Sequence, residues 1–475
     1  MIHRLALILC CAILCACGDS QPAAPATPAP EQHPRARSVV LFTIDTLRAD
    51  RIAMYRGDAP SSPATARLAD DSLVFDRAYS QACNTSPAVA SFLTGLLPPR
   101  HGVLHQVAKM NSSVVTLPMM LKTAGLRTGS FVANLCKLQD VQPSVFNEGW
   151  DVRFCGMDDN TPQHAWDQAV VDAGMEFIRQ AEADGVPYMA WIHLMDPHSE
   201  YDPAPEDWDH ESSPVKAKIA QVQYLSSFEE TFAPPPAPVL DRLNALYDAE
   251  VTGSDRQLGR MLDFLDGLPG GDDIALIFSA DHGEELYETW PRIGHGFSMT
   301  EGVLHVPLAI RAPGVEAGRT DALVETLSIT PTVLGLLGLE SPYELDGTTL
   351  LAEDPGVQAA RSFESGLAMT LRTDDHRYWR RTVKKAPTRE WVGWRLVAPW
   401  FQQAECMASF VGPWQYQPQW IALDDPQQQP VVSEMRSQAG RLMDTIRAQP
   451  PIEEIVDADY LQQLRELGYI GEDQH

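Results

Sequence analysis

Short, predominantly apolar segments recur along this chain, and several of them stop abruptly at a polar cluster. These segments are residues 38–44, 129–133, 188–195, 274–280 and 306–311. Apolar runs of this length indicate strands that are buried on both faces, as in a parallel sheet. Helical patterns lie between them, at residues 117–124, 165–183 and 243–265. This alternation predicts an α/β fold with a central, mostly parallel sheet that is flanked by helices on both faces.

Polar side chains directly follow several of the predicted strands. They are Asp45, Asn134, Asp196, His198, Asp281 and His282. The carboxyl ends of parallel strands share one edge of a sheet, and ligands of open α/β sheets bind beyond that edge. Each residue alone is equally well explained as a helix cap or as a solvated strand end. Their convergence on one edge predicts a binding site.

The amino terminus has the pattern of an export signal. Residues 1–4 supply a positive start, and residues 5–16 form an apolar run that is too short to span a bilayer. The run ends in Leu14-Cys15-Ala16-Cys17, which resembles a bacterial lipobox. The resemblance implies that residues 1–17 are a lipoprotein signal peptide, cleaved before a diacylated Cys17. A plain cleaved signal is the alternative.

Residues 18–36 are rich in Ala and Pro and are expected to form a tether between a membrane and the folded chain. Together with the signal, they predict an exported protein that is lipid-anchored at the periplasmic face of the cell envelope. Gly18 gives no clear signal for retention at the inner membrane, so the outer membrane is preferred.

The composition of the chain limits the kinds of partner that it can bind. The net charge of -28 argues against nucleic acid, because phosphate binding needs clustered Lys and Arg. An acidic protein still binds an anionic substrate where a metal cation supplies positive charge. Apart from the signal and the anchor, the cysteines are Cys83, Cys136, Cys155 and Cys406. Export permits disulfides. Cys136 and Cys155 are the nearest pair in sequence, and four buried thiols are the alternative.

The pattern changes after about residue 350, where shorter segments appear among many Trp, Gln and Pro residues. Segments at 369–372 and 391–397 predict antiparallel strands, and residues 460–467 predict a closing helix. We therefore expect a main domain over residues 37–350 and a small α+β subdomain over residues 351–475. Residues 203–240, rich in Pro, Ser and charge, are expected to form a long surface excursion.

The polar clusters occur in an order that resembles the sulfatase branch of the alkaline phosphatase superfamily. The matching segments are residues 45–50 (DTLRAD), 85–95 (TSPAVASFLTG), 100–102 (RHG), 196–198 (DPH), 279–285 (SADHGEE) and 294–296 (GHG). The resemblance runs from about residue 37 to the C-terminus. It implies an alkaline phosphatase-like fold and a metal-dependent hydrolase of phosphate- or sulfate-type esters.

The resemblance places Asp45, Asp281 and His282 at a divalent metal ion. Such an ion neutralises charge on the transferred group and activates an attacking oxygen. The family often has a second Asp where Thr46 stands, and Asn where His282 stands. Fewer carboxylates and one imidazole favour Zn²⁺ or Mn²⁺ over Ca²⁺, which prefers oxygen ligands. A helix cap at residues 281–282 is the alternative.

The nucleophile position holds Thr85. Sulfatases carry Cys or Ser there, converted to formylglycine, with Pro two residues on and Arg four residues on; this chain has Pro87 but Val89. Threonine cannot become formylglycine by that route, so none is expected. Threonine nucleophiles in this superfamily accompany phosphoryl transfer, which favours a phosphodiester, phosphomonoester or phosphonate. A helix N-cap is the structural alternative for Thr85.

Further site residues follow from the same resemblance. His198 and His295 are expected to contact the ester oxygens or to protonate the leaving group, with a second metal site, joined by Asp196, as the alternative. Arg48, Asn134 and Asp196 are expected to bind the substrate. Asn134 lies near the substrate-clamping position, and the alternative for Arg48 is an ion pair that braces its loop. His193, which lies inside a predicted strand, is expected to be a core histidine.

Three other functions remain open at this stage. One is a transferase that moves a phospho-group between envelope glycans or lipids. Another is a sulfatase that works without formylglycine. The third is a non-catalytic binding lipoprotein that keeps the fold.

Overall fold

The computed structural model describes most of the chain between residues 36 and 447. The described residues are 36–57, 59, 62–106, 108–133, 146–157, 161–199, 201–208, 236–288, 293–296, 298–364, 368–381, 405–410 and 419–447. The predicted signal peptide, the lipidation site Cys17 and residues 18–35 of the predicted tether lie outside this part of the chain. So do Asn134, Cys136, the strand expected at 391–397, the helix expected at 460–467 and most of the excursion.

A nine-stranded sheet dominates the described chain, in the order β11-β2-β10-β6-β1-β5-β3-β4, with β9 beside β2. Its strands are β1 (Ser38–Ile44), β2 (Leu73–Tyr79), β3 (Arg127–Val132), β4 (Val152–Cys155), β5 (Tyr188–Leu194), β6 (Ile274–Ala280), β9 (His305–Val306), β10 (Leu308–Arg311) and β11 (Gly318–Glu325). Strands β6, β1, β5, β3 and β4 run parallel, and β10 is antiparallel to β6 and β2. The prediction of a mostly parallel α/β sheet is therefore confirmed.

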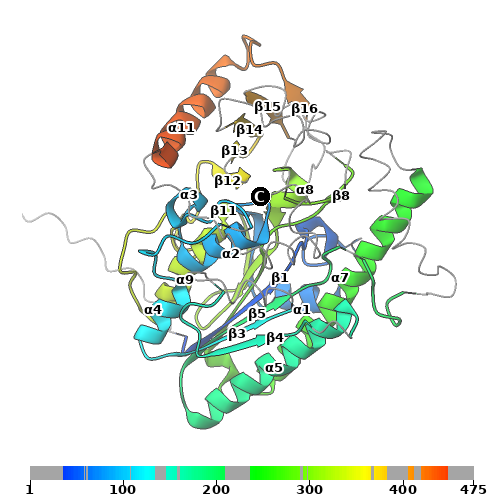
Figure 1. Ribbon diagram of the computed structural model, residues 1–475, viewed down its shortest axis with the longest axis vertical. Coiled ribbons are helices and arrows are strands. Elements are labelled where there is room, and N and C mark those ends of the chain that lie inside the picture. Colours follow the sequence, from blue (N-terminus) through cyan, green and yellow to red (C-terminus); the bar gives the residue numbers. More distant parts are fainter. Residues whose placement is uncertain are drawn as a thin grey trace, which may run out of the picture. The chain divides into compact units, whose positions relative to one another are not determined.

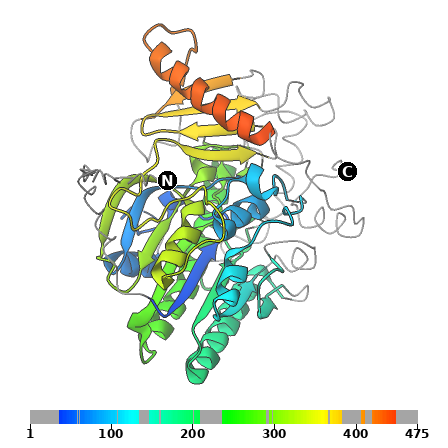
Figure 2. The ribbon, with the colours of Figure 1, turned by 90° about the vertical axis from the view of Figure 1, so that its left-hand side faces the viewer.

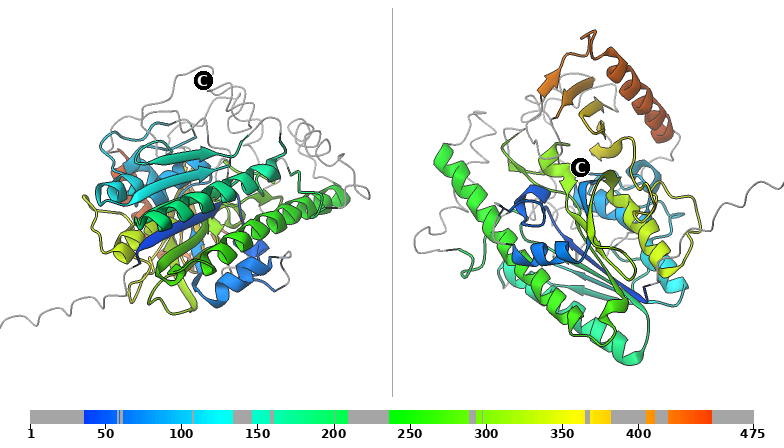
Figure 3. Two further views of the ribbon diagram at one scale, coloured as in Figure 1. Left: turned by 90° about the horizontal axis from the view of Figure 1, so that it is seen from below. Right: turned by 180° about the vertical axis from the view of Figure 1, so that it is seen from behind.

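Alternate residues of β1 enter two separate cores. Val40 and Phe42 pack on one side with α1 (Pro63–Asp70), α5 (Gln163–Asp184) and α7 (Ala237–Asp266). Val39 and Leu41 pack on the other side with α2 (Thr85–Thr94), α4 (Leu117–Thr123) and α9 (Ile329–Leu337). The period of two in a strand explains this division. Figure 1 shows the two helix layers, and Figure 3 shows α5 and α7 side by side.

The predicted segments largely match these elements. Strands β1 and β6 have the expected bounds, and α7 begins earlier than expected. The segment predicted at 306–311 is divided into β9 and β10, because Pro307 has no N–H to donate to a ladder. Short elements complete this region: η1 (Ala49–Arg51), α3 (Pro98–His101), η3 (Gly271–Asp273), β7 (Glu285–Leu286), β8 (Ile293–Gly294), α8 (Glu301–Leu304) and η4 (Thr326–Ser328).

A second, antiparallel sheet follows in the sequence. It consists of β12 (Ala360–Glu364), β13 (Ala368–Arg372), β14 (His376–Arg381), β15 (Glu405–Ser409) and β16 (Gln419–Ile421). Helix α11 (Gln429–Arg447) covers one face of this sheet through Val432, Met435, Ala439 and Met443 (Figure 2). The small C-terminal subdomain with antiparallel strands is thus confirmed. Sequence reasoning did not predict α11.

Glu301 in α8 connects the second sheet to the first. Its Oε1 accepts from Arg372 Nε at 2.8 Å and from an Arg377 guanidinium nitrogen at 2.8 Å, and its Oε2 accepts from the Tyr79 hydroxyl at 2.8 Å. All four side chains are buried. Strand β12 is also joined to the segment before α2, because the Ser362 hydroxyl donates to Ser80 O at 2.6 Å. The second sheet therefore supports the chain that leads into Thr85.

The cysteines are partly as expected. Cys155 is in a disulfide, while Cys83 and Cys406 are buried thiols. Because Cys136 lies outside the described residues, its pairing with Cys155 stays a prediction. Within the part of the chain that the structure describes, no helix has the length and apolar character that a membrane span requires.

Candidate active site

Two aspartates meet at the carboxyl edge of the main sheet. Ile44 and Ala280 are in register on neighbouring parallel strands, so Asp45 and Asp281, the next residue of each strand, lie side by side. Asp281 Oδ1 accepts the backbone N–H of His282 at 2.7 Å and that of Thr46 at 3.3 Å. Thr46 has a φ of 55°, a left-handed conformation that is costly for a residue with a Cβ. The turn after β1 is thus shaped to hold Asp281.

The remaining oxygens of this pair have no hydrogen-bond partner among the described residues. They are both carboxylate oxygens of Asp45 and Oδ2 of Asp281, and both side chains are fully buried. Buried carboxylate oxygens without donors are rare, because desolvating them is costly. A bound cation is the usual compensation.

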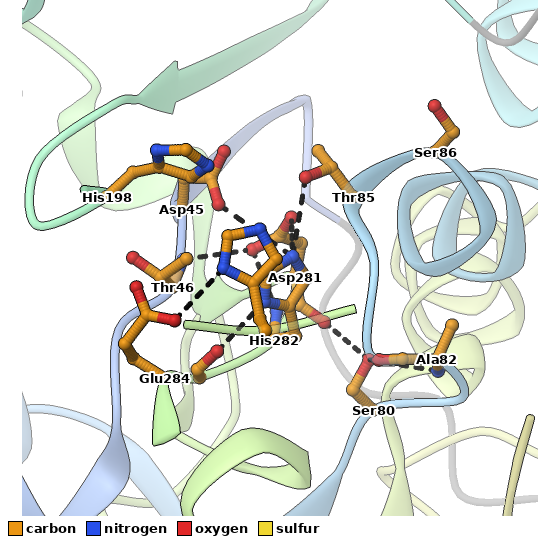
Figure 4. Close-up of polar contacts among 12 residues, drawn as sticks. Asp45, Thr46, Ser80, Ala82, Thr85, Ser86, His198, Asp281, His282 and Glu284 are labelled. Atoms are coloured by element: carbon orange, nitrogen blue, oxygen red, sulfur yellow. Dashed lines mark hydrogen bonds and ion pairs between the residues drawn. The ribbon is translucent and has the colours of Figure 1, made fainter. Parts of the chain in front are cut away.

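His282 turns one ring nitrogen toward these oxygens. Its Nδ1 lies 2.9 Å from Gly283 O, and a carbonyl only accepts, so Nδ1 carries the proton. In the neutral ring, Nε2 then carries a lone pair and no proton. It lies 3.4 Å from Asp281 Oδ2, 3.9 Å from Asp45 Oδ1 and 3.3 Å from Thr85 Oγ1. These side chains surround one point in Figure 4. Lone pairs that face one another in this way fit a metal ion.

Thr85 is the first residue of α2, and Asn84 holds the N-cap position. The Thr85 side chain is buried, and its hydroxyl faces His282. The backbone N–H of the next residue, Ser86, donates to Gln106 Oε1 at 3.0 Å, and the Ser86 hydroxyl lies 3.2 Å from Gln106 O. The hydroxyl of Thr85 is therefore directed into the site, whereas that of Ser86 points away (Figure 4).

A histidine that we expected in the core also faces the aspartates. His193 Nε2 lies 3.8 Å from Asp45 Oδ2, and Asp45, His193 and Asp281 offer donor atoms within 4.8 Å of one another. His193 is buried in β5 as predicted, but its ring points toward the site rather than into an apolar core. The available signal was an ionisable residue in an otherwise apolar strand, three residues before Asp196.

His198 and His295 belong to the same group of rings as His282. The His295 ring is 4.5 Å from that of His282 and 4.8 Å from that of His198. His295 Nδ1 is 3.0 Å from Glu284 Oε1, and the Tyr201 hydroxyl donates to Glu284 Oε2 at 3.3 Å. Glu284 is buried, whereas the His295 side chain is 12% exposed. His295 is therefore the member of this group that meets solvent, and Glu284 fixes its ring.

The pKa values of the two aspartates are shifted in opposite directions. Burial opposes ionisation of Asp45, but His198, His193 and His282 outweigh it and hold its pKa below the ordinary value. Burial and the charge of Asp45 raise the pKa of Asp281 to about 7. Burial lowers the pKa of His198 and of His282, which favours the neutral imidazoles that ligate metals.

Two expected substrate-binding residues have other contacts. The Arg48 guanidinium donates twice to Asp50, each at 2.9 Å, and to Glu284 O at 3.1 Å. This geometry favours the bracing alternative for Arg48. Asp196 accepts from Gln163 Nε2 at 3.1 Å, and its carbonyl accepts from Ser254 at 2.7 Å. Asp196 is thus held by α5 and α7, in the loop that carries His198.

Comparison with known proteins shows the family of this chain. A family model described as Sulfatase matches residues 37–339. An ulvan-active sulfatase of Formosa agariphila is 24% identical over 356 residues, which are 70% of this chain and 68% of that protein.

Solved structures share the fold. One protein, solved in complex with its substrate D-glucosamine-2-N,6-O-disulfate, has a TM-score of 0.67 at 15% identity, over 88% of this chain and 99% of the other. A phosphonate monoester hydrolase from Silicibacter pomeroyi has a TM-score of 0.64 at 19% identity, over 85% and 94%.

Proposed function

The chain belongs to the sulfatase family of ester hydrolases, and we propose that it is a metal-dependent hydrolase that uses Thr85 to cleave phosphate-type esters. One observation carries the proposal: the Thr85 hydroxyl lies 3.3 Å from His282 Nε2, beside buried carboxylate oxygens that have no hydrogen-bond partner within the described part of the chain. A nucleophile and a set of metal donors therefore face one small volume.

Asp45, Asp281 and His282 are suited to hold the ion. The atoms that they turn toward the site are carboxylate oxygens and one imidazole nitrogen, which favours Zn²⁺ or Mn²⁺ over Ca²⁺. When bound, such an ion would lower the pKa of the Thr85 hydroxyl and neutralise charge on the ester. Asp281 must lose its proton to bind, and its raised pKa makes that step dependent on pH.

Thr85 Oγ1 then attacks the phosphorus atom, its proton having passed to solvent, and the ester oxygen leaves from the opposite side. His295 is placed to protonate that oxygen, because Glu284 fixes its ring through Nδ1 and its side chain is the partly exposed member of this group. Water next attacks the phosphorylated Thr85 and restores the hydroxyl. His198, whose ring borders that of His295, is placed to contact the ester oxygens.

The preference for phosphate over sulfate rests on Thr85, which cannot yield formylglycine by the sulfatase route. The lipobox at Cys17 supports an enzyme tethered at the periplasmic face of the envelope, acting on an anionic ester there.

The test is turnover of aryl phosphate diesters, aryl phosphate monoesters and aryl sulfates by the protein loaded with Zn²⁺ or Mn²⁺. We expect cleavage of a phosphate ester, and a loss in kcat of roughly 10³-fold or more in Thr85→Ala. Ser86→Ala, which removes the neighbouring hydroxyl, is the matched control and should keep most activity. Turnover of the sulfate alone would contradict the phosphate preference, and full activity in Thr85→Ala would contradict the nucleophile.

A further inference from the structure

We propose that His193 is a ligand of the metal ion, and that Thr43 and Trp191 hold its ring in the ligating tautomer. The inference rests on the proposed metal dependence and adds a residue from β5 to the donors from β1 and β6. It also replaces our expectation that His193 is a core histidine.

The position of His193 is the first argument. Its side chain is fully buried, and its Nε2 has no hydrogen-bond partner among the described residues. Nε2 lies 3.8 Å from Asp45 Oδ2, which is too long for a hydrogen bond. The other oxygen of Asp45, Oδ1, faces His282 Nε2 at 3.9 Å. One carboxylate therefore lies between two imidazoles and contacts neither directly.

These separations are those of ligands around a common ion. Metal–ligand bonds of about 2.0–2.1 Å place neighbouring ligand atoms roughly 3–4 Å apart. The distances from Asp45 to His193 and to His282, and the 3.4 Å from His282 to Asp281, all fall in this range. A pair stabilised only by its own ion pair would instead close to about 2.7–3.0 Å.

The tautomer is the second argument. The Trp191 indole N–H donates to Thr43 Oγ1 at 2.9 Å, and His193 Nδ1 lies 2.8 Å from the same oxygen. The Thr43 hydroxyl has its own acceptor in Ile192 O at 3.4 Å. In this arrangement Thr43 accepts from both rings, so His193 Nδ1 carries the proton and Nε2 presents a lone pair to Asp45. Histidines that bind metals commonly donate their other N–H in this way, which orients the ring.

The opposite arrangement leaves an unmet donor. If Thr43 donated to His193 Nδ1, the proton would be on Nε2 and would point at Asp45 Oδ2 without reaching it. That arrangement leaves a buried N–H and a buried carboxylate oxygen both unsatisfied, which is costly because neither group is hydrated. The tautomer that ligates a metal avoids this cost once the ion is bound.

The experiment is a Co²⁺ titration of the chelator-treated protein, followed by visible absorption, which reports both the affinity and the ligand field. In His193→Asn, the Asn amide keeps a donor for Thr43 and removes the atom that faces Asp45. We expect the Kd for Co²⁺ to rise roughly 10- to 1,000-fold, with a changed spectrum. Thr43→Val should raise it by about 10–100-fold, and Thr43→Ser, which keeps the hydroxyl, should restore wild-type affinity.

The outcomes of this titration distinguish the proposed ligand from the proposed metal dependence. His193→Asn with the affinity and spectrum of the wild type would overturn the proposal, and so would Thr43→Val that binds as tightly as the wild type. A wild-type protein that binds no Co²⁺ would overturn the proposed metal dependence itself. Thermal unfolding of each variant in chelator separates lost ligation from lost folding. Thr43→Val decides the question if His193→Asn does not fold.

Discussion

Two buried clusters of charge in this protein contrast with each other. Around Glu301, each carboxylate oxygen accepts a hydrogen bond, from two arginines or from Tyr79. Around Asp45 and Asp281, three of the four oxygens have no hydrogen-bond partner among the described residues. Burial opposes ionisation in both clusters, but Arg372 and Arg377 lower the pKa of Glu301 to about 2, whereas the pKa of Asp281 rises to about 7.

The difference shows which cluster is complete. The Glu301 cluster contains its own cations and joins α8 to β13 and β14. The Asp45 cluster has two carboxylates with histidines whose pKa is lowered by burial, so it lacks a fixed positive charge. A buried charge without a partner costs several kcal/mol. We therefore interpret the first cluster as structural and the second as a receptor for a cation.

Asp281→Asn should have the largest effect and should separate activity from stability. The amide oxygen still accepts the N–H groups of Thr46 and His282, but the charge that would face the proposed metal ion is lost. We expect kcat/KM to fall by about 10²–10⁴-fold. In chelator at pH 7.5, the variant should be at least as stable as the wild type, as measured by urea unfolding. A less stable apo variant would contradict the view that this carboxylate is strained without an ion.

Glu301→Gln should instead lower the stability of the protein. Removing the charge leaves Arg372 and Arg377 buried without a carboxylate, so the free energy of unfolding should fall by about 3–5 kcal/mol. Urea unfolding measures the loss. The matched control is Glu176→Gln, which breaks an exposed pair with Arg179 and should leave stability nearly unchanged. An equal response of the two variants would remove the distinction between this cluster and a surface ion pair.

The two clusters should also respond to pH with opposite signs. Glu301 has a folded pKa below its ordinary value of 4.5, so its contribution is present above that pH and is lost as the pH falls toward about 2. Asp281 has a folded pKa above its ordinary value of 3.8, so the metal-free protein loses stability as the pH rises from about 4 to about 7. The expected change for Asp281 is on the order of a few kcal/mol.

Chelated wild type and Asp281→Asn, unfolded in urea at intervals from pH 4 to pH 8, measure the second slope. Their difference in stability should grow with pH and then level off near pH 7. A difference that does not vary with pH would contradict the raised pKa of Asp281.

The sequence predicted the fold where a residue's own segment determined its position. Strands β1 and β6 are predominantly apolar, are buried throughout and are followed by an aspartate, so their bounds followed from composition. Strand β2 (LVFDRAY) and strand β11 (GRTDALVE) are only partly buried and mix polar with apolar residues. The sequence did not predict these two strands, because their conformation depends on pairing with other strands. Strand β2 pairs with β10 and with β11.

The same limit applies to the candidate site. Asp45, Asp281, His282 and Thr85 were predicted to lie together, and the structure brings them together. His193 was not predicted to lie with them. Its proposed role depends on Thr43 in the neighbouring strand β1 and on Asp45, which follows that strand. The contact of Glu284 with His295 depends likewise on two separate turns. The roles assigned to these residues remain predictions.

The most direct test of the account is the metal content of the dialysed protein after exposure to Zn²⁺ or Mn²⁺, measured by inductively coupled plasma mass spectrometry. Wild type and Glu176→Gln should retain at least one divalent ion per chain, and Asp45→Asn should lose it. Folded wild-type protein that retains no divalent ion would contradict the claim that a cation completes the Asp45 cluster.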